Sequence, residues 1–395
     1  MLLRLDINNF DNIKFGGVDF FGSTNPRRTS EYWVNSADYK TNTITALVGF
    51  NAAARFSIFR ATTLLTEFIT GRVLGSTPRS KSSSYKMVSK FSDAKNRNNP
   101  NNPNLTVYIQ NEQTYRFSVS FSNDKLLEES LCRVVDNKLF ETVASRRYNH
   151  GSEKYELFFD ESFTFTEDEL NKLVHQNDGA SLLSFDKIKE NKQVIDFCDF
   201  FQNSRSFVGE NTISGDAIQI AAQAYFNSPK LLKNAQKIIS QLDMLDEKAD
   251  ILIEKSDTGV FNICVQHLIG SHTVRLEMEQ QGSGFIHMFT LLSELVPVMC
   301  SGGMLTINDI DIHLHPMIAS VLMTMHKADR CNAKTQVLCS LSSPYALSEL
   351  NQDQTYIVKS KNDDVQILSV ESYKMRGDTD LYKKYQENGF GDMPE

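Results

Sequence analysis

The stretch ALVGFNAAARFSIFRATTLL, residues 46–65, determines how the rest of this chain is interpreted. A short apolar run ends at Gly49, a turn of small residues follows, and helical periodicity starts at about Arg55. Strand, glycine turn and helix in this order are typical of a phosphate-binding loop, G-x-x-x-x-G-K-[ST]. Counted from Gly49, the last three required positions fall on Ala54, Arg55 and Phe56. The stretch therefore predicts a phosphate-loop backbone with altered side chains.

Composition is that of a globular protein with material for two or three domains, at 395 residues, 41% hydrophobic and 23% charged. The net charge of −8 argues against a broad nucleic-acid-binding face. The six cysteines form no CxxC pair, so neither a zinc ribbon nor a redox pair is indicated, and we expect reduced thiols in a cytoplasmic protein. The start MLLRLDINNFDNIKF does not have the pattern of a signal peptide, and no apolar run predicts a membrane span.

The composition and the hydrophobic periodicity change twice in the middle of the chain. Residues 76–104 are rich in Ser, Asn and Pro, and we expect an exposed loop there. Residues 105–165 alternate apolar and polar side chains between turn pairs, which predicts an antiparallel meander. Residues 166–205 and 214–247 have helical spacing, and Thr166 followed by Glu169 predicts a capping box at a helix start.

Three late segments resemble parts of one reaction site. They are EQQGSGFIHMFTLLSEL at residues 279–295, GGMLTINDIDIHLHP at 302–316 and TQVLCSLSSPYALSEL at 335–350. The second has the form of a Walker B strand, an apolar run that ends in acidic or amide residues before a turn and a helix. The first lies where an ABC signature helix is expected, and the third where a strand ending in a switch histidine is expected.

Taken together, these segments resemble bacterial AAA-family ATPases of ABC type, the stand-alone ATPases similar to RloC, AbiL and OLD-type proteins, and more distantly SMC heads. In that family the loop commonly reads GxNaaGKSnLlrAl, and here it reads GFNAAARFSIFRAT. The Walker B segment commonly reads lviDEiDrsLHP, and here it reads LTINDIDIHLHP. The resemblance implies an α/β fold, an ABC/SMC-head-like P-loop NTPase core with an antiparallel β and helical insertion.

The same resemblance implies a division of the chain. The expected parts are an N-terminal lobe with a vestigial P-loop (1–75), a β-meander and helical insertion or arm (76–255), a C-terminal lobe (256–375) and a tail (376–395). The C-terminal lobe carries the signature-like helix, the Walker B-like strand and the switch strand.

Within the loop, the resemblance assigns a vestigial nucleotide pocket to residues whose chemistry has changed. Ala54 adds a Cβ where Gly allows close approach to phosphate, and Arg55 is longer and forked where Lys is expected. Phe56 replaces the hydroxyl that binds Mg²⁺. Ser57 is adjacent, but one helical residue rotates direction by about 100°, so it is not expected to take over.

At Walker B, the resemblance aligns the magnesium-side Asp with Asn308, a neutral amide, and the general-base Glu with Asp309, which is one methylene shorter. The signature Ser aligns with Gln280 or Gln281 while Gly282 is retained. The switch His aligns with Ser342, or with the residue after it, and a hydroxyl does not replace imidazole as a charged sensor.

Metal binding is not expected. The segment DIDIHLHP holds Asp309, Asp311, His313 and His315, but the family-like turn explains the last histidine, and we interpret the segment as structural. No resident cofactor is expected either, although Gly49, Asn51 and Arg55 still offer N–H groups and charge that could retain ATP without efficient hydrolysis.

The sequence therefore favours a pseudo-ATPase that serves as a structural or regulatory subunit. Proteins resembling this family often work in anti-phage defence beside a nuclease or toxin effector. A homodimer, or a heterodimer with an ATPase-fold chain, is expected, because each site in such dimers uses the loop of one chain and the signature of the other. Two alternatives stay open: a slow but active ATPase, and a nucleic-acid-binding module that uses the locally basic residues 79–86.

Overall fold

The structure is a computed structural model. It describes residues 1–25, 28–35, 39–49, 52–71, 102–122, 125–135, 139–174, 181–207, 214–269, 271–330, 332–361 and 364–391. Most of the loop predicted for residues 76–104 lies outside these ranges, and strand β6 already begins at Asn104, inside the predicted loop.

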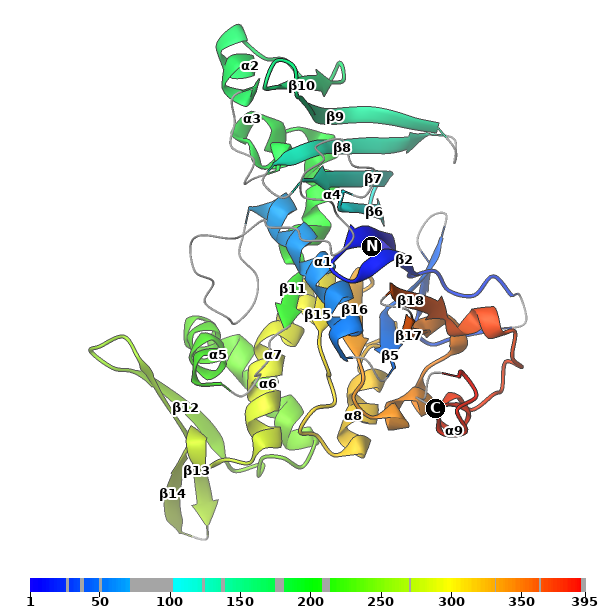
Figure 1. The fold of residues 1–395 in the computed structure, drawn as a ribbon. Helices are drawn as coiled ribbons and strands as arrows, with labels where there is room; N and C mark the ends of the chain where they lie inside the picture. The colour runs from blue at the N-terminus through cyan, green and yellow to red at the C-terminus, as the bar shows by residue number, and fades with distance from the viewer. Residues whose placement is uncertain are drawn as a thin grey trace.

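A six-stranded sheet contains the strand before the loop, the Walker B-like strand and the switch strand (Figure 1). In spatial order its strands are β11 (Arg205–Phe207), β15 (Gly303–Ile307), β16 (Thr335–Ser340), β5 (Ile44–Val48), β17 (Thr355–Lys361) and β18 (Asp364–Ser369). The first five are parallel, and β18 is antiparallel to β17. Every residue of β5, β15 and β16 is buried, as expected for parallel strands that are covered on both faces.

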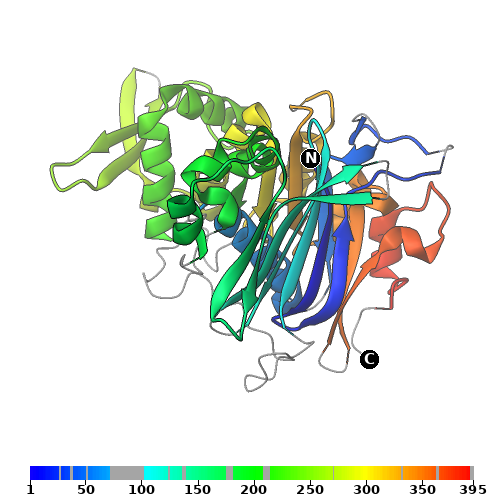
Figure 2. The ribbon, with the colours of Figure 1, turned by 90° about the horizontal axis from the view of Figure 1, so that it is seen from above.

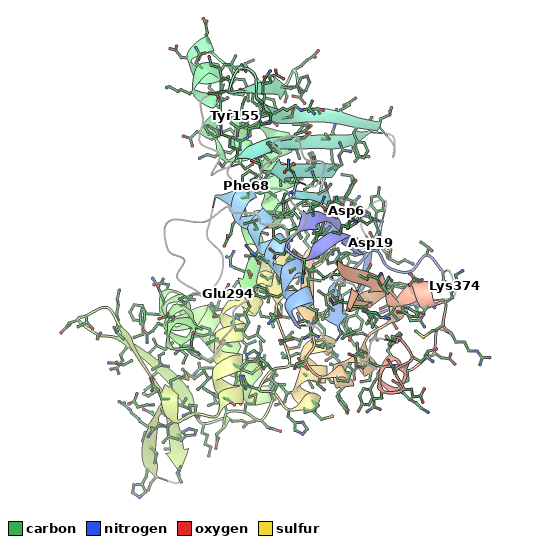
Figure 3. The ribbon with its side chains drawn as sticks, in the orientation of Figure 1. Asp6, Asp19, Phe68, Tyr155, Glu294 and Lys374 are labelled. Carbon is green, nitrogen blue, oxygen red and sulfur yellow. The ribbon has the colours of Figure 1, made fainter. Side chains whose placement is uncertain are left out.

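Helices cover both faces of this sheet. Ala46 and Val48 of β5 point into one hydrophobic cluster, and Leu47 points into a second. The first cluster includes residues of α5 (Gly215–Asn227), α6 (Pro229–Gln241), α7 (Ser283–Ser301) and α8 (Pro316–Thr324). The second includes residues of α1 (Ala52–Thr70) and α4 (Lys192–Asn203). In Figure 3, Glu294 marks α7, and its carboxylate lies 3.7 Å from Nε of Arg205 on β11.

A seven-stranded antiparallel sheet extends from the second cluster (Figure 2). In spatial order its strands are β10 (Lys154–Phe159), β9 (Leu139–Asn149), β8 (Leu126–Val135), β7 (Thr114–Phe121), β6 (Asn104–Gln110), β1 (Leu2–Phe10) and β2 (Ile13–Asp19). The predicted meander is present, and the first two strands of the chain continue it through the β1–β6 pairing. Phe117 on the buried face packs on Phe197 of α4, whereas Asp6 and Asp19 lie on the polar face (Figure 3).

The remaining elements are short. The strands are β3 (Trp33–Asn35), β4 (Lys40–Asn42), β12 (Asp250–Lys255), β13 (Phe261–Ile269) and β14 (His272–Glu277). The helices are α2 (Glu167–Val174), α3 (Asp186–Lys189), α9 (Leu381–Gln386) and the 3₁₀ turns η1 (Leu182–Ser184), η2 (Met278–Gln280), η3 (Pro344–Glu349), η4 (Gln352–Gln354) and η5 (Val370–Tyr373). Strands β12–β14 project from the body in Figure 1. The predicted capping box is confirmed, since Thr166 N donates to the Glu169 carboxylate at 2.8 Å before α2.

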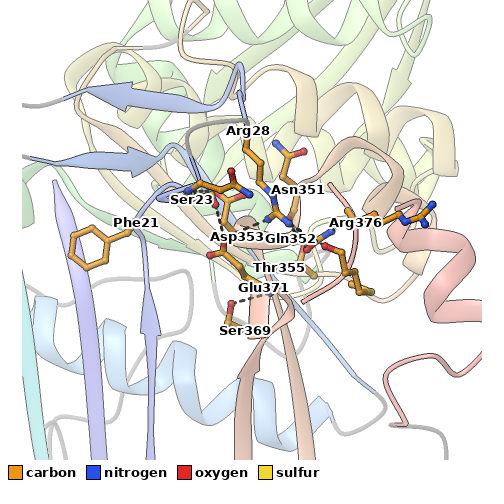
Figure 4. Close-up of polar contacts among 12 residues, drawn as sticks. Phe21, Ser23, Arg28, Asn351, Gln352, Asp353, Thr355, Ser369, Glu371 and Arg376 are labelled. Carbon is orange, nitrogen blue, oxygen red and sulfur yellow. Dashed lines mark hydrogen bonds and ion pairs between the residues drawn. The ribbon is translucent and has the colours of Figure 1, made fainter. Parts of the chain in front are cut away.

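A polar cluster ties the segment after β2 to the segment before β17 (Figure 4). Trp33 Nε1 and Ser23 N donate to the Asp353 carboxylate at 2.8 and 3.2 Å, and Arg28 Nη2 donates to Gln352 at 3.0 Å. Asp353 is buried, and this burial raises the pKa of its carboxyl group. The Asp353 cluster therefore joins parts of the chain more than 300 residues apart.

Among the described residues, one helix, α7, is long and apolar enough to cross a membrane by length and composition. Residues such as Phe289 and Leu292 of α7 are fully buried in the first hydrophobic cluster. Its apolar character is therefore explained by its position between the sheet and helices α5 and α6.

Candidate vestigial nucleotide site

The three motif strands place their carboxyl ends at one edge of the six-stranded sheet. Strand β16 lies between β5, which ends before Gly49, and β15, which ends before Asn308. Because the strands are parallel and adjacent, the residues that follow them meet at this edge, where ligands bind in open α/β sheets. The structure thus brings together the loop, Walker B and switch positions that the sequence predicted.

Gly49 adopts a conformation that only glycine accepts easily. Its φ is +144°, and an added Cβ would lie well under 3.0 Å from the Val358 carbonyl oxygen of β17. Of the other loop residues predicted for the site, Asn51 lies outside the described residues, and so does the side chain of Ala54. The first glycine of the motif is thus required by the packing of β5 against β17.

Arg55 turns back into the loop and pairs with the candidate base. Its guanidinium donates through Nη1 to the Gly49 carbonyl oxygen, and Nη2 lies 3.3 Å from Asp309 Oδ1. The Arg55 side chain is only 7% exposed. Two residues 254 positions apart, which the sequence assigned to separate roles, therefore form one partly buried ion pair.

Ser340, the last residue of β16, holds the Walker B pair. Its hydroxyl lies 3.1 Å from Asn308 Oδ1 and 2.9 Å from Asp309 Oδ1, and it accepts from Asp309 N at 2.6 Å. Asp309 has a left-handed φ of +47°, and this contact supports that backbone. Ser340 was not predicted from the sequence. It could have been found as a polar residue at the end of a predicted buried strand.

Asp311 fixes the loop that follows β16. Its buried carboxylate accepts from Ser342 N at 2.7 Å, from Ser342 Oγ at 2.9 Å and from Ser343 N at 2.6 Å. Burial raises the pKa of Asp311, and these hydrogen bonds oppose that shift. The serines at the switch position are thus held by a side chain of the Walker B turn.

Ser57 is directed toward the turn between β1 and β2. Its hydroxyl donates to Asn12 Oδ1 at 2.8 Å, in the turn between β1 and β2. Nearby, Arg60 Nη1 lies 2.7 Å from Asp11 Oδ1. Phe56 stays half-buried at the position where a hydroxyl would hold Mg²⁺.

The signature-like segment begins α7. Gln280 Oε1 accepts from Glu277 N at 2.8 Å in a capping box, and Gly282 is the exposed N-cap of α7. An added Cβ on Gly284 would lie 2.9 Å from the His313 carbonyl oxygen, so this helix start packs closely on the turn after Asp309. Gln280 and Gly282 are not among the residues that line the pocket beside Arg55.

A pocket of about 500 Å³ opens beside Arg55. Its walls come from the end of β5, α1, the loop after β16, η3 and α9. They are formed by Val48, Gly49, Arg55, Leu341, Ser342, Pro344, Tyr385 and Gln386. The wall from α9 belongs to the predicted tail, whose residues Leu381 and Tyr385 are buried in the first hydrophobic cluster.

Metal ligands do not converge in the described part of the chain, where no three His, Cys, Asp or Glu side chains are grouped for an ion. His313 is exposed, and His315 Nδ1 accepts from Met317 N at 3.2 Å as the N-cap of α8. The described cysteines are free, and Cys331 lies outside the described residues.

Comparisons with solved structures found SMC head domains. The SMC head domain from Thermotoga maritima aligns with a TM-score of 0.44 at 12% identity, over 93% of this chain and 98% of that chain. An SMC head bound to the C-winged helix domain of ScpA aligns with a TM-score of 0.49 at 12% identity, over 95% and 99%. An Smc head domain with an extended coiled coil, bound to the C-terminal domain of ScpA derived from Pyrococcus furiosus, gives 0.43 at 11% identity, over 94% and 97%.

A scan against protein-family models and a search of curated proteins each gave no match. The strand order supports the predicted α/β core, since the loop, switch and Walker B strands are adjacent and parallel, and each is followed by its predicted motif. The chain has an α/β fold with a mainly parallel sheet and an antiparallel β and helical insertion, which is the architecture that the resemblance to ABC/SMC-head-like P-loop cores implied.

Proposed function

We propose that this chain is a catalytically degenerate ATPase-fold protein that acts as a structural or regulatory subunit of a cytoplasmic bacterial complex, of the kind that defends against phage. The observation that carries this proposal is the partly buried pair between Arg55 and Asp309. A general base must reach its water within about 3 Å. Here the candidate base is engaged by the residue that stands in for the phosphate-clamping lysine.

The metal positions support the same conclusion. Mg²⁺ in such sites is bound through oxygen ligands, usually a hydroxyl and a carboxylate. Phe56 offers neither, and the Asn308 amide oxygen carries no charge and lies 3.1 Å from the Ser340 hydroxyl. Without the ion, the charge that develops on a transferred phosphoryl group is not neutralised.

The experiment is phosphate release from ATP with Mg²⁺, for the wild type, Arg55→Ala and Asp309→Ala. We expect all three to remain at the background of a buffer control, with folding checked by circular dichroism. Robust turnover in the wild type that both substitutions abolish would show that the site is active, and the degenerate assignment would be wrong.

A slow ATPase, or a protein that binds ATP without turnover, is the second candidate. The observation that favours it is the open pocket of about 500 Å³ beside Arg55. In this case Arg55 would clamp phosphate and Asp309 would act as base. Equilibrium binding of ATP, measured with and without Mg²⁺, separates retention of the nucleotide from its hydrolysis.

Partners follow from the same proposal. We expect a homodimer, or a heterodimer with an intact ATPase-fold chain, together with a nuclease or toxin effector. The exposed start of α7 at Gly282, where an added side chain would meet nothing within 4 Å, leaves the signature-like surface accessible. Purification with the products of neighbouring genes, followed by mass measurement of the complex, tests this; a chain that stays monomeric beside all of them would contradict it.

A further inference from the structure

The pocket beside Arg55 combines one buried cation with walls that are mainly apolar, together with the polar side chains of Ser342 and Gln386. Val48, Leu341, Pro344 and the Tyr385 ring supply apolar surface, and Arg55 supplies the charge. A volume of about 500 Å³ lies within the range of about 300–1,000 Å³ that is typical of small-molecule sites. The lining thus suits a compact ligand with an apolar body and one anionic end.

Arg55 retains hydrogen-bonding capacity for such a ligand. Its Nε is buried and has no acceptor among the described residues, while Nη1 and Nη2 contact Gly49 and Asp309. A guanidinium binds carboxylate and phosphate groups through paired N–H donors. Helix α1 begins at Ala52, directly after this loop, so its N-terminal N–H groups favour negative charge at the same edge.

Asp309 is the group that an incoming anion would replace. If Arg55 turned toward a ligand, Asp309 would keep the Ser340 hydroxyl at 2.9 Å and the Asn308 amide at 3.3 Å. The exchange therefore leaves neither charge without a partner, which buried charges require.

We propose that this pocket binds a small aromatic anion, an aryl phosphate or an aryl carboxylate, without a metal ion. Arg55 exchanges Asp309 for the anionic group, and the ring lies against Tyr385 and Pro344. The proposal rests on the degenerate site above, because a pocket that assembled Mg·ATP for hydrolysis would use Arg55 and Asp309 differently.

The C-terminal segment is an integral wall of this site. Lys359 Nζ donates to the Phe390 carbonyl and, at 3.1 Å, to the Gly391 carbonyl, while Tyr373 Oη donates to the Phe390 carbonyl at 3.3 Å. Phe390 is itself buried. These contacts hold α9 over the loop, so Tyr385 is positioned before any ligand arrives.

The test is calorimetric titration of the full chain in EDTA with phenyl phosphate, benzoate and inorganic phosphate. We expect an aryl probe to bind about tenfold tighter than inorganic phosphate, because the ring buries apolar surface. Phenyl phosphate against benzoate identifies which anionic group is preferred. No binding of either aryl probe, or binding no tighter than inorganic phosphate, overturns the proposal.

Variants locate the site. Arg55→Met should weaken the aryl probe by at least about tenfold, whereas Asp309→Asn should tighten it, because the competing charge is removed while its polar contacts remain. Tyr385→Ala should weaken the aryl probe but leave inorganic phosphate unchanged. Arg60→Met, on the same helix but paired with Asp11, is the matched control and should change neither.

An aryl probe that binds equally to folded Arg55→Met and to the wild type, or more weakly to folded Asp309→Asn, also overturns the proposal. Circular dichroism and urea unfolding verify that each variant is folded. Phosphate release from Mg·ATP is measured separately, so loss of the anion site and loss of the degenerate assignment give different results.

Discussion

At the residue scale, Gly49 allows the loop to form because glycine has no Cβ that would clash with β17. We expect Gly49→Ala to destabilise the protein by about 2–4 kcal/mol, because a Cβ would overlap the Val358 carbonyl and φ is +144°. Urea unfolding followed by circular dichroism measures this change. Gly282→Ala is the control, since φ is −64° and nothing lies within 4 Å, and as a change at a helix N-cap it should cost no more than about 1 kcal/mol.

His287 is a second residue with a measurable consequence. Burial lowers the pKa of His287 to about 4 from 6.5, so on acidification the unfolded chain takes up a proton before the folded chain does. Stability should therefore fall between pH 6.5 and about 4, and this histidine contributes roughly 3 kcal/mol of that loss.

The check is the free energy of unfolding at pH 7 and at pH 4.5. His287→Gln should show a smaller loss over this interval than the wild type. The exposed His272→Gln serves as control and should lose as much as the wild type. An unchanged pH dependence in folded His287→Gln would contradict the assignment.

At the element scale, one buried ion pair ties the seven-stranded sheet to η1. Arg146 Nε of β9 lies 2.8 Å from Glu129 Oε2 of β8, both side chains are at most 1% exposed, and Leu182 N also donates to Glu129 at 3.0 Å. Removing one partner leaves a buried charge uncompensated, so Glu129→Gln should cost about 3–5 kcal/mol.

The same two strands offer the control. Arg147 and Glu128 lie 3.9 Å apart with side chains 71% and 50% exposed. Glu128→Gln should therefore change the free energy of unfolding by about 0.5 kcal/mol or less. Equal effects of the two substitutions would mean that burial does not set the strength of the Glu129 pair.

At the scale of the whole molecule, the Asp353 cluster connects residues 23–33 near the N-terminus to residues 352–353 in the C-terminal part of the chain (Figure 4). Asp353→Ala would leave Trp33 Nε1 and Ser23 N without this acceptor, and we expect a loss of about 2–4 kcal/mol. Trp33 is the single tryptophan, so its fluorescence emission should shift as the cluster opens. The exposed Asp378→Ala is the control, and a loss of similar size there would contradict the role of Asp353.

Several features could be predicted from the sequence because they depend on local period and burial. The apolar run before Gly49 predicted a buried strand, and the helix after it followed from apolar spacing. The alternation in residues 105–165 predicted the meander, and Thr166 predicted a helix start. The order of the loop, Walker B and switch motifs along the chain then predicted the α/β core. Motifs that follow parallel strands meet at one edge of a sheet.

By itself the sequence determined the elements around the motifs, the antiparallel meander, the α/β core and which motif positions carry altered side chains. Only the tertiary structure decided that Arg55 pairs with Asp309, that Ser340 holds the Walker B residues and that α9 walls the pocket. The physical reason is reach: local patterns depend on residues a few positions apart, whereas these contacts join side chains on different strands and helices. Which side chains meet is set by sheet order and by the direction each one takes once its neighbours are packed.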